Sequence, residues 1–170
     1  WPTGIRLDEG CEPGAAIAVD SLRGDIFMSD AKQRVIWQIR GVTGGSEGEK
    51  GISELTTQVG GDVLAMSVDA KARKLYWLEA AGPAGKSQGL QRHTSLMSVD
   101  LSGKDVVRVH TFSATPSLMA FHESSQQAFF VDQQSGQLTS LNLKTMKIAV
   151  LGGDLEGVTG LAAGGREEDP

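Results

Sequence analysis

Cysteine is almost absent from this sequence, which has only Cys11 among its 170 residues. A disulfide within the chain is therefore excluded, and a partner for Cys11 in a flanking segment or another chain stays open. Asn142, the single asparagine, is followed by Leu-Lys, so the chain has no N-glycosylation acceptor. Neither feature assigns the protein to a compartment.

Long apolar runs are also lacking, and none approaches the roughly 20 residues that a membrane-spanning helix needs. The 16 lysine and arginine residues are dispersed and the formal net charge is −5, so no basic surface suits nucleic acid or anionic lipid. We expect no nucleic-acid partner and no direct membrane insertion of this segment. Because the chain begins at Trp1 with neither initiator methionine nor signal peptide, we expect a processed or excised piece.

Proline is scarce, and long stretches with the apolar spacing of a helix are missing. The chain instead has apolar runs of five to seven residues, separated by clusters of Gly, Ser, Asp and Lys that are typical of turns. Hydrophobic residues make up 39% and charged residues 22%, which is ordinary for a globular protein. The pattern predicts an all-β fold with antiparallel neighbouring strands.

An internal repeat organises these strands. Residues 16–30, 65–79 and 118–132 align without gaps, each as an apolar strand, a polar turn and a second apolar strand. Two more predicted strands follow each segment, so each unit has four. The residues that end the first and second strands are ten positions apart in every unit, namely Asp20 and Asp30, Asp69 and Glu79, and His122 and Asp132.

Four short antiparallel strands at a period of roughly 40 to 50 residues are the sequence signature of a β-propeller blade. We predict about three blades and part of a fourth. Small residues on the innermost strands and bulky ones on the next strand would fill the space between blades. The expected boundaries are a lead-in or remnant of a neighbouring blade at 1–12, blades at 13–57, 58–112 and 113–154, and the first strand of a further blade with a tail at 155–170.

Several of these segments resemble the YWTD motif of low-density lipoprotein receptor class B repeats. They are Phe27-Met28-Ser29-Asp30, Tyr76-Trp77-Leu78-Glu79 and Phe129-Phe130-Val131-Asp132. The opening stretch Trp1 to Asp8 is similar to the family's "WPNGLAVD", and Leu101-Ser102-Gly103-Lys104 resembles its "NLDGS" turn. No unit has the full tetrad, and His122 replaces the usual aspartate.

This resemblance implies part of a six-bladed propeller that binds proteins outside the cell. The expected function is a non-enzymatic recognition module of a receptor or matrix protein, extracellular or on the cell surface, without a cofactor or metal. A half-ring would expose two blade faces, so a second chain or a missing segment would complete the propeller. Exposed basic residues in loops are the expected anchors for a protein ligand, namely Arg40, Arg92, His93 and Arg166.

Arg23-Gly24-Asp25 matches the tripeptide that integrins read on some extracellular loops. The tripeptide falls in the turn between the first two predicted strands, and the second strand follows at once. We therefore weigh a possible adhesion motif against a plain turn and favour the turn.

Two enzymatic or cofactor-binding alternatives stay open. A propeller hydrolase with a metal in the central channel would use the residues that end the innermost strands, which are Asp8, Asp20, Asp69 and His122. A nucleotide-binding protein would use Gly85-Lys86-Ser87, which resembles part of a phosphate-binding loop, although Gly89 interrupts the helix that such a loop needs. Asp30, Glu79 and Asp132 occur once per unit at one spacing, so we interpret them as structural hydrogen-bond acceptors.

Overall fold

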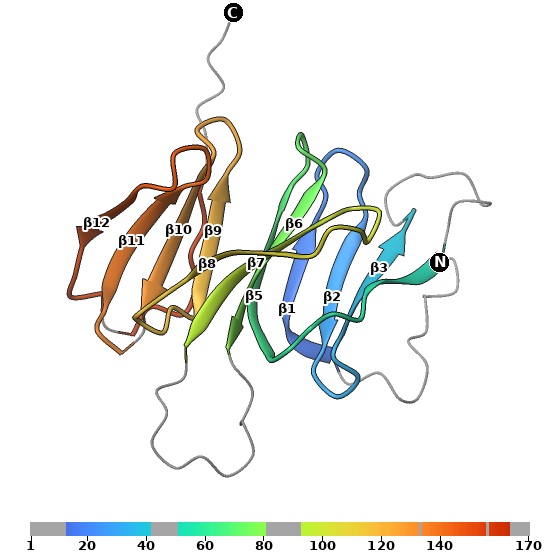
Figure 1. The fold of residues 1–170 in the computed structure, drawn as a ribbon, viewed down its shortest axis with the longest axis horizontal. Coiled ribbons are helices and arrows are strands. Elements are labelled where there is room, and N and C mark those ends of the chain that lie inside the picture. Colours follow the sequence, from blue (N-terminus) through green and yellow to red (C-terminus); the bar gives the residue numbers. More distant parts are fainter. Residues whose placement is uncertain (1–12, 42–50, 81–92, 133, 156, 164–170) are drawn as a thin grey trace, which may run out of the picture.

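The structure is a computed structural model that describes residues 13–41, 51–80, 93–132, 134–155 and 157–163. In these residues it contains three four-stranded sheets and no helix (Figure 1). The first sheet has β1 (Pro13–Val19), β2 (Ile26–Asp30), β3 (Val35–Arg40) and β4 (Gly51–Thr56). The second has β5 (Asp62–Asp69), β6 (Lys74–Ala80), β7 (Thr94–Asp100) and β8 (Val107–Thr111). The third has β9 (Leu118–His122), β10 (Gln127–Asp132), β11 (Gln137–Asn142) and β12 (Ile148–Gly152).

Each sheet is a meander in which consecutive strands pair antiparallel, so the all-β prediction and the four-stranded units are confirmed. We refer to the sheets as the first, second and third blades. Their innermost strands β1, β5 and β9 lie next to one another along the molecule. A further strand predicted at 158–163 is not formed, because in the described residues this segment has no strand to pair with.

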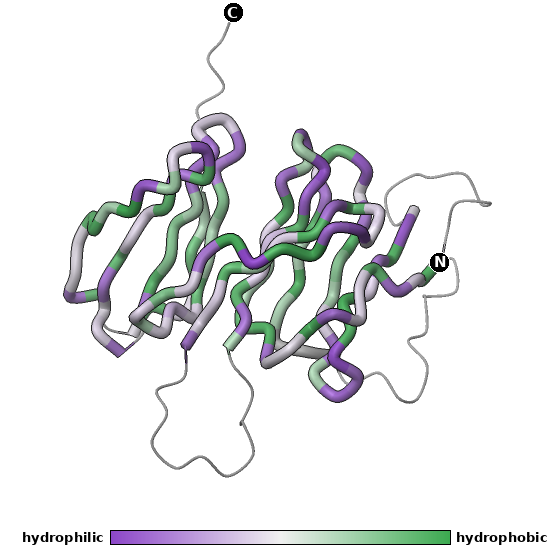
Figure 2. Tube along the Cα trace, in the orientation of Figure 1, coloured by the Kyte–Doolittle hydropathy of each residue, from purple (hydrophilic) through white to green (hydrophobic). Residues whose placement is uncertain are grey.

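Two apolar clusters hold the three blades together. The first joint packs Phe27 and Ile36 of the first blade against Trp77 of the second. The second joint packs Leu96 of the second blade against Phe130 of the third. All five side chains are fully buried, and each contributes roughly 1.5–3 kcal/mol by leaving water. Figure 2 shows the hydrophobic segments along the strands and the hydrophilic ones at the turns.

The period of two along a strand explains why each blade serves both joints. On β6, Leu75 and Trp77 belong to the first joint, whereas Tyr76 and Leu78 belong to the second. The bulky second-strand residues thus fill the space between blades, as the sequence predicts. A blade in the middle must therefore be apolar on both faces.

The acids that end the strands organise the turns. The Oδ1 atom of Asp20 accepts hydrogen bonds from the backbone N–H groups of Leu22 (2.9 Å) and Arg23 (3.2 Å). Asp132 binds the two equivalent N–H groups of its own turn, at 2.8 and 3.2 Å. An aspartate that bonds its own following backbone stabilises a tight turn. The residues that end the first and second strands of a blade are ten positions apart because one turn and one strand lie between them.

A second set of bonds crosses each joint. The fourth residue after the end of the inner strand (Asp20, Asp69 or His122) has a left-handed backbone in every blade, with φ of 70° at Gly24, 56° at Arg73 and 54° at Gln126. From there Arg73 forms an ion pair with the fully buried carboxylate of Asp20 in the preceding blade. Gln126 donates from Nε2 to Oδ2 of Asp69, at 2.8 Å. We call these two contacts the blade latches.

Replacing Arg73 by alanine should destabilise the protein by about 2–4 kcal/mol, because the Asp20 carboxylate would stay buried without its cation. Arg73→Gln should lose less, since the third blade uses glutamine at the same position. Urea unfolding measures both changes. Arg108→Ala, at an exposed arginine outside both latches, should change stability by less than about 0.5 kcal/mol. Equal losses for the two alanine variants would show that the latch is not stabilising.

Candidate functional site: a groove between two blades

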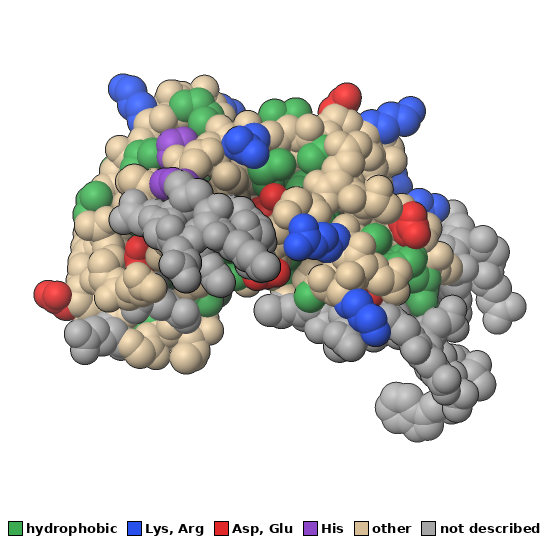
Figure 3. Space-filling model, turned by 60° about the horizontal axis from the view of Figure 1, so that its bottom comes forward, with side chains coloured by type: hydrophobic (Ala, Val, Ile, Leu, Met, Phe, Trp, Pro, Cys, Tyr) green, Lys and Arg blue, Asp and Glu red, His purple; other side chains and the backbone are tan. Residues whose placement is uncertain are grey.

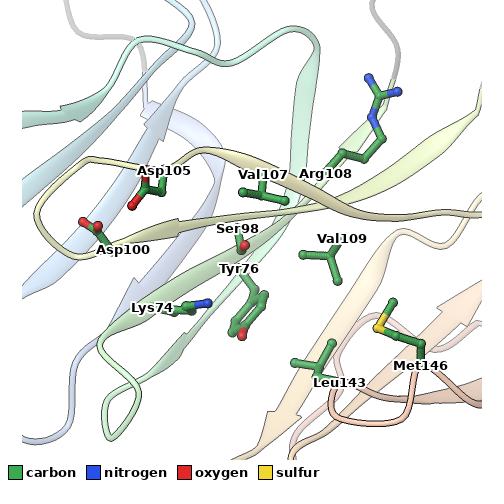
Figure 4. Close-up of a pocket in the computed structure, with 10 residues that line it drawn as sticks. All are labelled: Lys74, Tyr76, Ser98, Asp100, Asp105, Val107, Arg108, Val109, Leu143 and Met146. Carbon is green, nitrogen blue, oxygen red and sulfur yellow. The ribbon is translucent and has the colours of Figure 1, made fainter.

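A groove of about 500 Å³ opens at the second joint, between the outer strand β8 and the turn that connects β11 to β12 (Figure 4). Its apolar lining comes from both blades and consists of Val107, Val109, Leu143 and Met146. Its polar lining comes from the second blade and consists of Lys74, Tyr76, Ser98, Asp100, Asp105 and Arg108. Both walls belong to this chain, so the groove is complete without any further blade.

At the equivalent place of the first joint, the β7–β8 turn packs closely on the first blade, and Gly103 explains why. A Cβ atom on Gly103 would lie 2.2 Å from the backbone oxygen of Leu55, so the β7–β8 turn packs directly on β4. In the third blade the equivalent position is Thr145. Thr145 is not left-handed as Gly103 is, and the left-handed residue of this turn is Met146, with φ of 56°. The two turns therefore differ in backbone conformation, and the groove lies beside the second of them.

Two carboxylates lie at one end of the groove (Figure 4). Asp100 accepts hydrogen bonds through Oδ1 from the Ser102 hydroxyl and from the N–H groups of Ser102 (2.7 Å) and Lys104 (3.1 Å). These bonds, with that of the Ser102 side chain foremost, lower the pKa of Asp100 below its usual value. Asp105 is exposed, with φ of 56°. This end of the groove therefore has two carboxylates, and Lys74 lies directly opposite Asp100 in the register of β6 and β7.

Tyr76 projects into the groove from β6 and is mostly buried. Its ring lies against Phe121 of the third blade, with centroids 5.5 Å apart. Burial, and then the nearby charge of Asp69, raise the pKa of the Tyr76 phenol above its ordinary value. The hydroxyl therefore stays protonated and can donate a hydrogen bond at any physiological pH.

The arginines and histidine predicted as ligand anchors do not form one surface. Arg40 is exposed at the end of β3 and donates to the Gln38 side chain at 3.2 Å. His93 is exposed immediately before β7 begins. β3 and β7 are the third strands of their blades, so these two residues lie at opposite ends of the sheets. Arg92 and Arg166 lie outside the described residues.

The groove itself was missed at the sequence level. Val107, Met146 and Asp105 have no motif around them that indicates binding. The usable signal is the difference between Gly103 in one turn and Thr145 in the equivalent turn, and it has meaning only once the blades are aligned in space.

The possible adhesion motif does not fit its place in the fold. Arg23 is exposed, but Asp25 is only 6% exposed and accepts a hydrogen bond from Nε2 of Gln38 at 2.9 Å. Gly24 is buried, and its N–H donates to the backbone oxygen of Asp20 at 2.7 Å. A partner could not reach the carboxylate without opening the blade, so the tripeptide is a turn.

The residues proposed for a central metal already have protein partners. Asp20 and Asp69 use one carboxylate oxygen in their own turn and the other in a blade latch. His122 Nδ1 is 2.7 Å from the Ser125 hydroxyl. Across the described residues, no three His, Cys, Asp or Glu side chains are grouped to hold a metal. Asp8, Cys11 and the Gly85-Lys86-Ser87 stretch lie outside them.

The second-strand acids have the structural role that their spacing suggests. Glu79 accepts from the backbone N–H of Gly60 and from the indole N–H of Trp77, both at 3.1 Å. Asp132 accepts from the N–H of Thr115 at 3.1 Å. Gly60 and Thr115 precede the inner strands of their blades, so these bonds fix where the chain enters each blade.

Basic and acidic side chains are scattered over the face drawn in Figure 3, without a patch of one sign. This distribution agrees with the dispersed charges of the sequence. In the part of the chain that the structure describes, no helix has the length and apolar character to cross a membrane.

No family model matches this sequence, and no curated protein matches it. Solved structures do match. U3-55K matches with 14% identity and a TM-score of 0.59, over 92% of this chain and 44% of that chain. A structural genomics protein of unknown function from Bacteroides thetaiotaomicron matches with 15% identity and a TM-score of 0.56, over 86% of this chain and 33% of that chain. A chain of a nidogen/laminin complex also matches, with 14% identity and a TM-score of 0.47, over 89% of this chain and 68% of that chain.

These similarities show the fold, an all-β chain of propeller-like blades that matches part of larger propeller structures. The chain spans 44% of the U3-55K chain and 33% of the bacterial one. Identities of 14% and 15% show a shared fold and do not show a shared function.

Replacing Gly103 by alanine should destabilise the protein by about 2 kcal/mol or more, because the new Cβ would collide with Leu55 and the left-handed backbone, with φ of 82°, adds strain. Gly153→Ala is the matched control, since nothing lies within 4 Å of its Cβ position. Thermal unfolding of the two variants makes the comparison. Similar melting temperatures would contradict the close packing at the first joint.

Tyr76 is the only tyrosine, so its ionisation can be followed directly by phenolate absorbance. In the folded protein it should titrate above 10.0, and in denaturant at its ordinary value. Since the unfolded chain then loses this proton first, stability should fall as the pH rises above about 10. Asp69→Asn should bring the folded pKa only part of the way back, because burial is the larger cause. A native titration at the ordinary value would contradict this packing.

Proposed function

We propose that this chain is a non-enzymatic protein-recognition module of an extracellular or cell-surface receptor or matrix protein, in a propeller of the YWTD type. The YWTD-like stretches of the sequence support the family and the location. The observation that supports recognition is the groove of the second joint, which joins an apolar wall to a polar end with two carboxylates. We propose this groove as the binding site.

The apolar wall provides a reason to bind. Val107 and Met146 are large, apolar and exposed, whereas the equivalent part of the first joint is closed by the Gly103 turn. Contiguous exposed apolar side chains on a soluble domain mark sites of interaction. Val109 and Leu143 pack partly against the core of the second joint, so the wall is rigid before a partner arrives. Little ordering is then needed on binding.

The two carboxylates of the groove supply orientation. Asp100 and Asp105 would attract a lysine or arginine of the partner, and the Tyr76 hydroxyl can donate to a backbone oxygen. The partner is thus a segment with an apolar residue next to a basic one. The charged end would raise the association rate and fix the direction of the segment more than it would raise affinity.

A role without catalysis is part of this proposal. Its support is that Asp20, Asp69, Glu79 and Asp132 all serve as acceptors for turns, latches or chain entry. A general acid or base must be able to reach a substrate proton. Carboxylates that are held this way by the fold are poorly suited to it.

Selection from a displayed peptide library tests the proposal. The immobilised chain should enrich peptides in which an apolar residue neighbours lysine or arginine. Their affinity should fall at least about tenfold in the double variant Val107→Asp/Met146→Asp, which removes the apolar wall. Asp105→Asn should relax the preference for the basic residue, and Leu22→Asp, an exposed turn residue outside the groove, is the matched control.

No enrichment over an empty support would contradict the proposal, as would peptides that bind the groove variant equally well. A stoichiometric divalent ion that survives dialysis would instead favour the hydrolase alternative. Mg-ATP that raises the melting temperature, with loss of the shift in Lys86→Ala, would favour nucleotide binding.

A further inference from the structure

The fold covers four of the five methionines and leaves the fifth in contact with solvent. Met28, Met66 and Met119 are 5%, 7% and 7% exposed. Met97 is partly buried against the core of the first joint. Met146, in the turn that connects β11 to β12, is 45% exposed. All five lie in the described residues, so Met146 is the methionine that a small reagent in solution reaches most readily.

The exposure of Met146 does not depend on where the sequence ends. The equivalent turn of the second blade packs on the preceding blade, where Gly103 meets Leu55. Met146 likewise lies on the side of its preceding blade, since with Leu143 it forms the wall of the groove opposite Val109 (Figure 4). A further blade after the third would pack on the other side of the third blade. Met146 would stay on the groove.

Hydrogen bonds within the turn hold Met146 at this place. Its N–H donates to the backbone oxygen of Asn142 at 2.8 Å. The Oδ1 atom of Asn142 accepts from the N–H groups of Lys144 (3.0 Å) and Thr145 (2.9 Å). An asparagine that bonds its own following backbone stabilises a tight turn. The wall of the groove therefore has a thioether on a fixed turn.

We infer that Met146 is a site of reversible oxidation and that its sulfoxide weakens binding in the groove. The second half of this inference rests on the proposed function. Hydrogen peroxide transfers one oxygen atom to the thioether sulfur: an S–O bond forms, the O–O bond breaks, the sulfur loses two electrons and water leaves. A sulfoxide is polar. An apolar side chain of the partner that packs on it would cover a hydrogen-bond acceptor without satisfying it.

The modification can be undone, which makes it a switch and not only damage. A methionine sulfoxide reductase with a dithiol breaks the S–O bond, releases the oxygen as water and leaves the dithiol as a disulfide. The thioether and the apolar wall are then restored. Met146 needs no other group of the protein for either reaction, since exposure of the sulfur is sufficient.

Peroxide treatment followed by digestion and mass spectrometry tests the first half. Cys11 is alkylated beforehand, because thiols also react with peroxide. In the folded chain, Met146 should gain one oxygen at least about tenfold faster than any other methionine. In denaturant all five should react at similar rates. Oxidation of another methionine as fast as Met146, in a chain that circular dichroism shows to be folded, would overturn the inference.

Affinity for a peptide from the library selection, measured before and after peroxide, tests the second half. Oxidation should weaken binding about tenfold, and the reductase should restore it. Met97→Leu, outside the groove, should lose affinity on oxidation as the unmodified chain does. Met146→Leu cannot form the sulfoxide, so its own affinity should be the same before and after treatment. Unchanged affinity of the oxidised unmodified chain, or a loss that persists in Met146→Leu, would overturn regulation by Met146.

The two halves fail in different ways. If the selection enriches no peptide, the proposed function is wrong and regulation falls with it, whereas the mapping alone decides whether Met146 is the preferred site of oxidation. If a peptide binds and oxidation has no effect, the proposed function stands and the inference is wrong. A saturating peptide should also protect Met146 from peroxide, and oxidation at an unchanged rate would contradict a shared site.

Discussion

Every blade in this protein is apolar on both faces, and this is the constraint on which the rest of the structure depends. Strands with a period of two place Trp77 against one neighbour and Tyr76 against the other, so no blade can bury its side chains alone. Stability is therefore a property of joints rather than of sheets, as in other repeat proteins. The same rule accounts for the exposure of Ile17 and Leu151, since no blade among the described residues packs against them.

Polar residues decide how the apolar faces align. Apolar packing is not directional, so it would tolerate a blade that slides or tilts. The latches remove this freedom, since Asp20 and Asp69 each bind their own turn with one oxygen and the next blade with the other. The left-handed backbone at Arg73 and Gln126 aims those side chains backward across the joint. One short motif at the end of an inner strand thus sets both the turn and the contact between blades.

Most of the architecture could be predicted from the sequence, because strand periodicity and turn-capping acids are local properties. Asp20 and Asp30 mark the ends of two strands whether or not anything is known of their neighbours. What could not be predicted is what lies opposite a residue in space. The segment 158–163 has no strand in the described residues to pair with, Asp25 is covered by Gln38, and Arg40 and His93 lie at opposite ends of the sheets. The groove lies beside the turn that has Thr145 where the second blade has Gly103, and this difference has meaning only once the blades are aligned in space.

The groove shows how a repeat can provide a candidate binding surface without a new element. All three blades have four strands and an outer-strand bulge at an equivalent position, and an apolar core closes both joints. Only the outer part of a joint is free to vary, because the inner strands must pack against one another. A turn that stands away from its neighbour there exposes Val107 and Met146 while the core beneath, around Leu96 and Phe130, stays closed. Binding surface can therefore be gained at the rim at little expense to the joint, and the rim is where variation among blades should be concentrated.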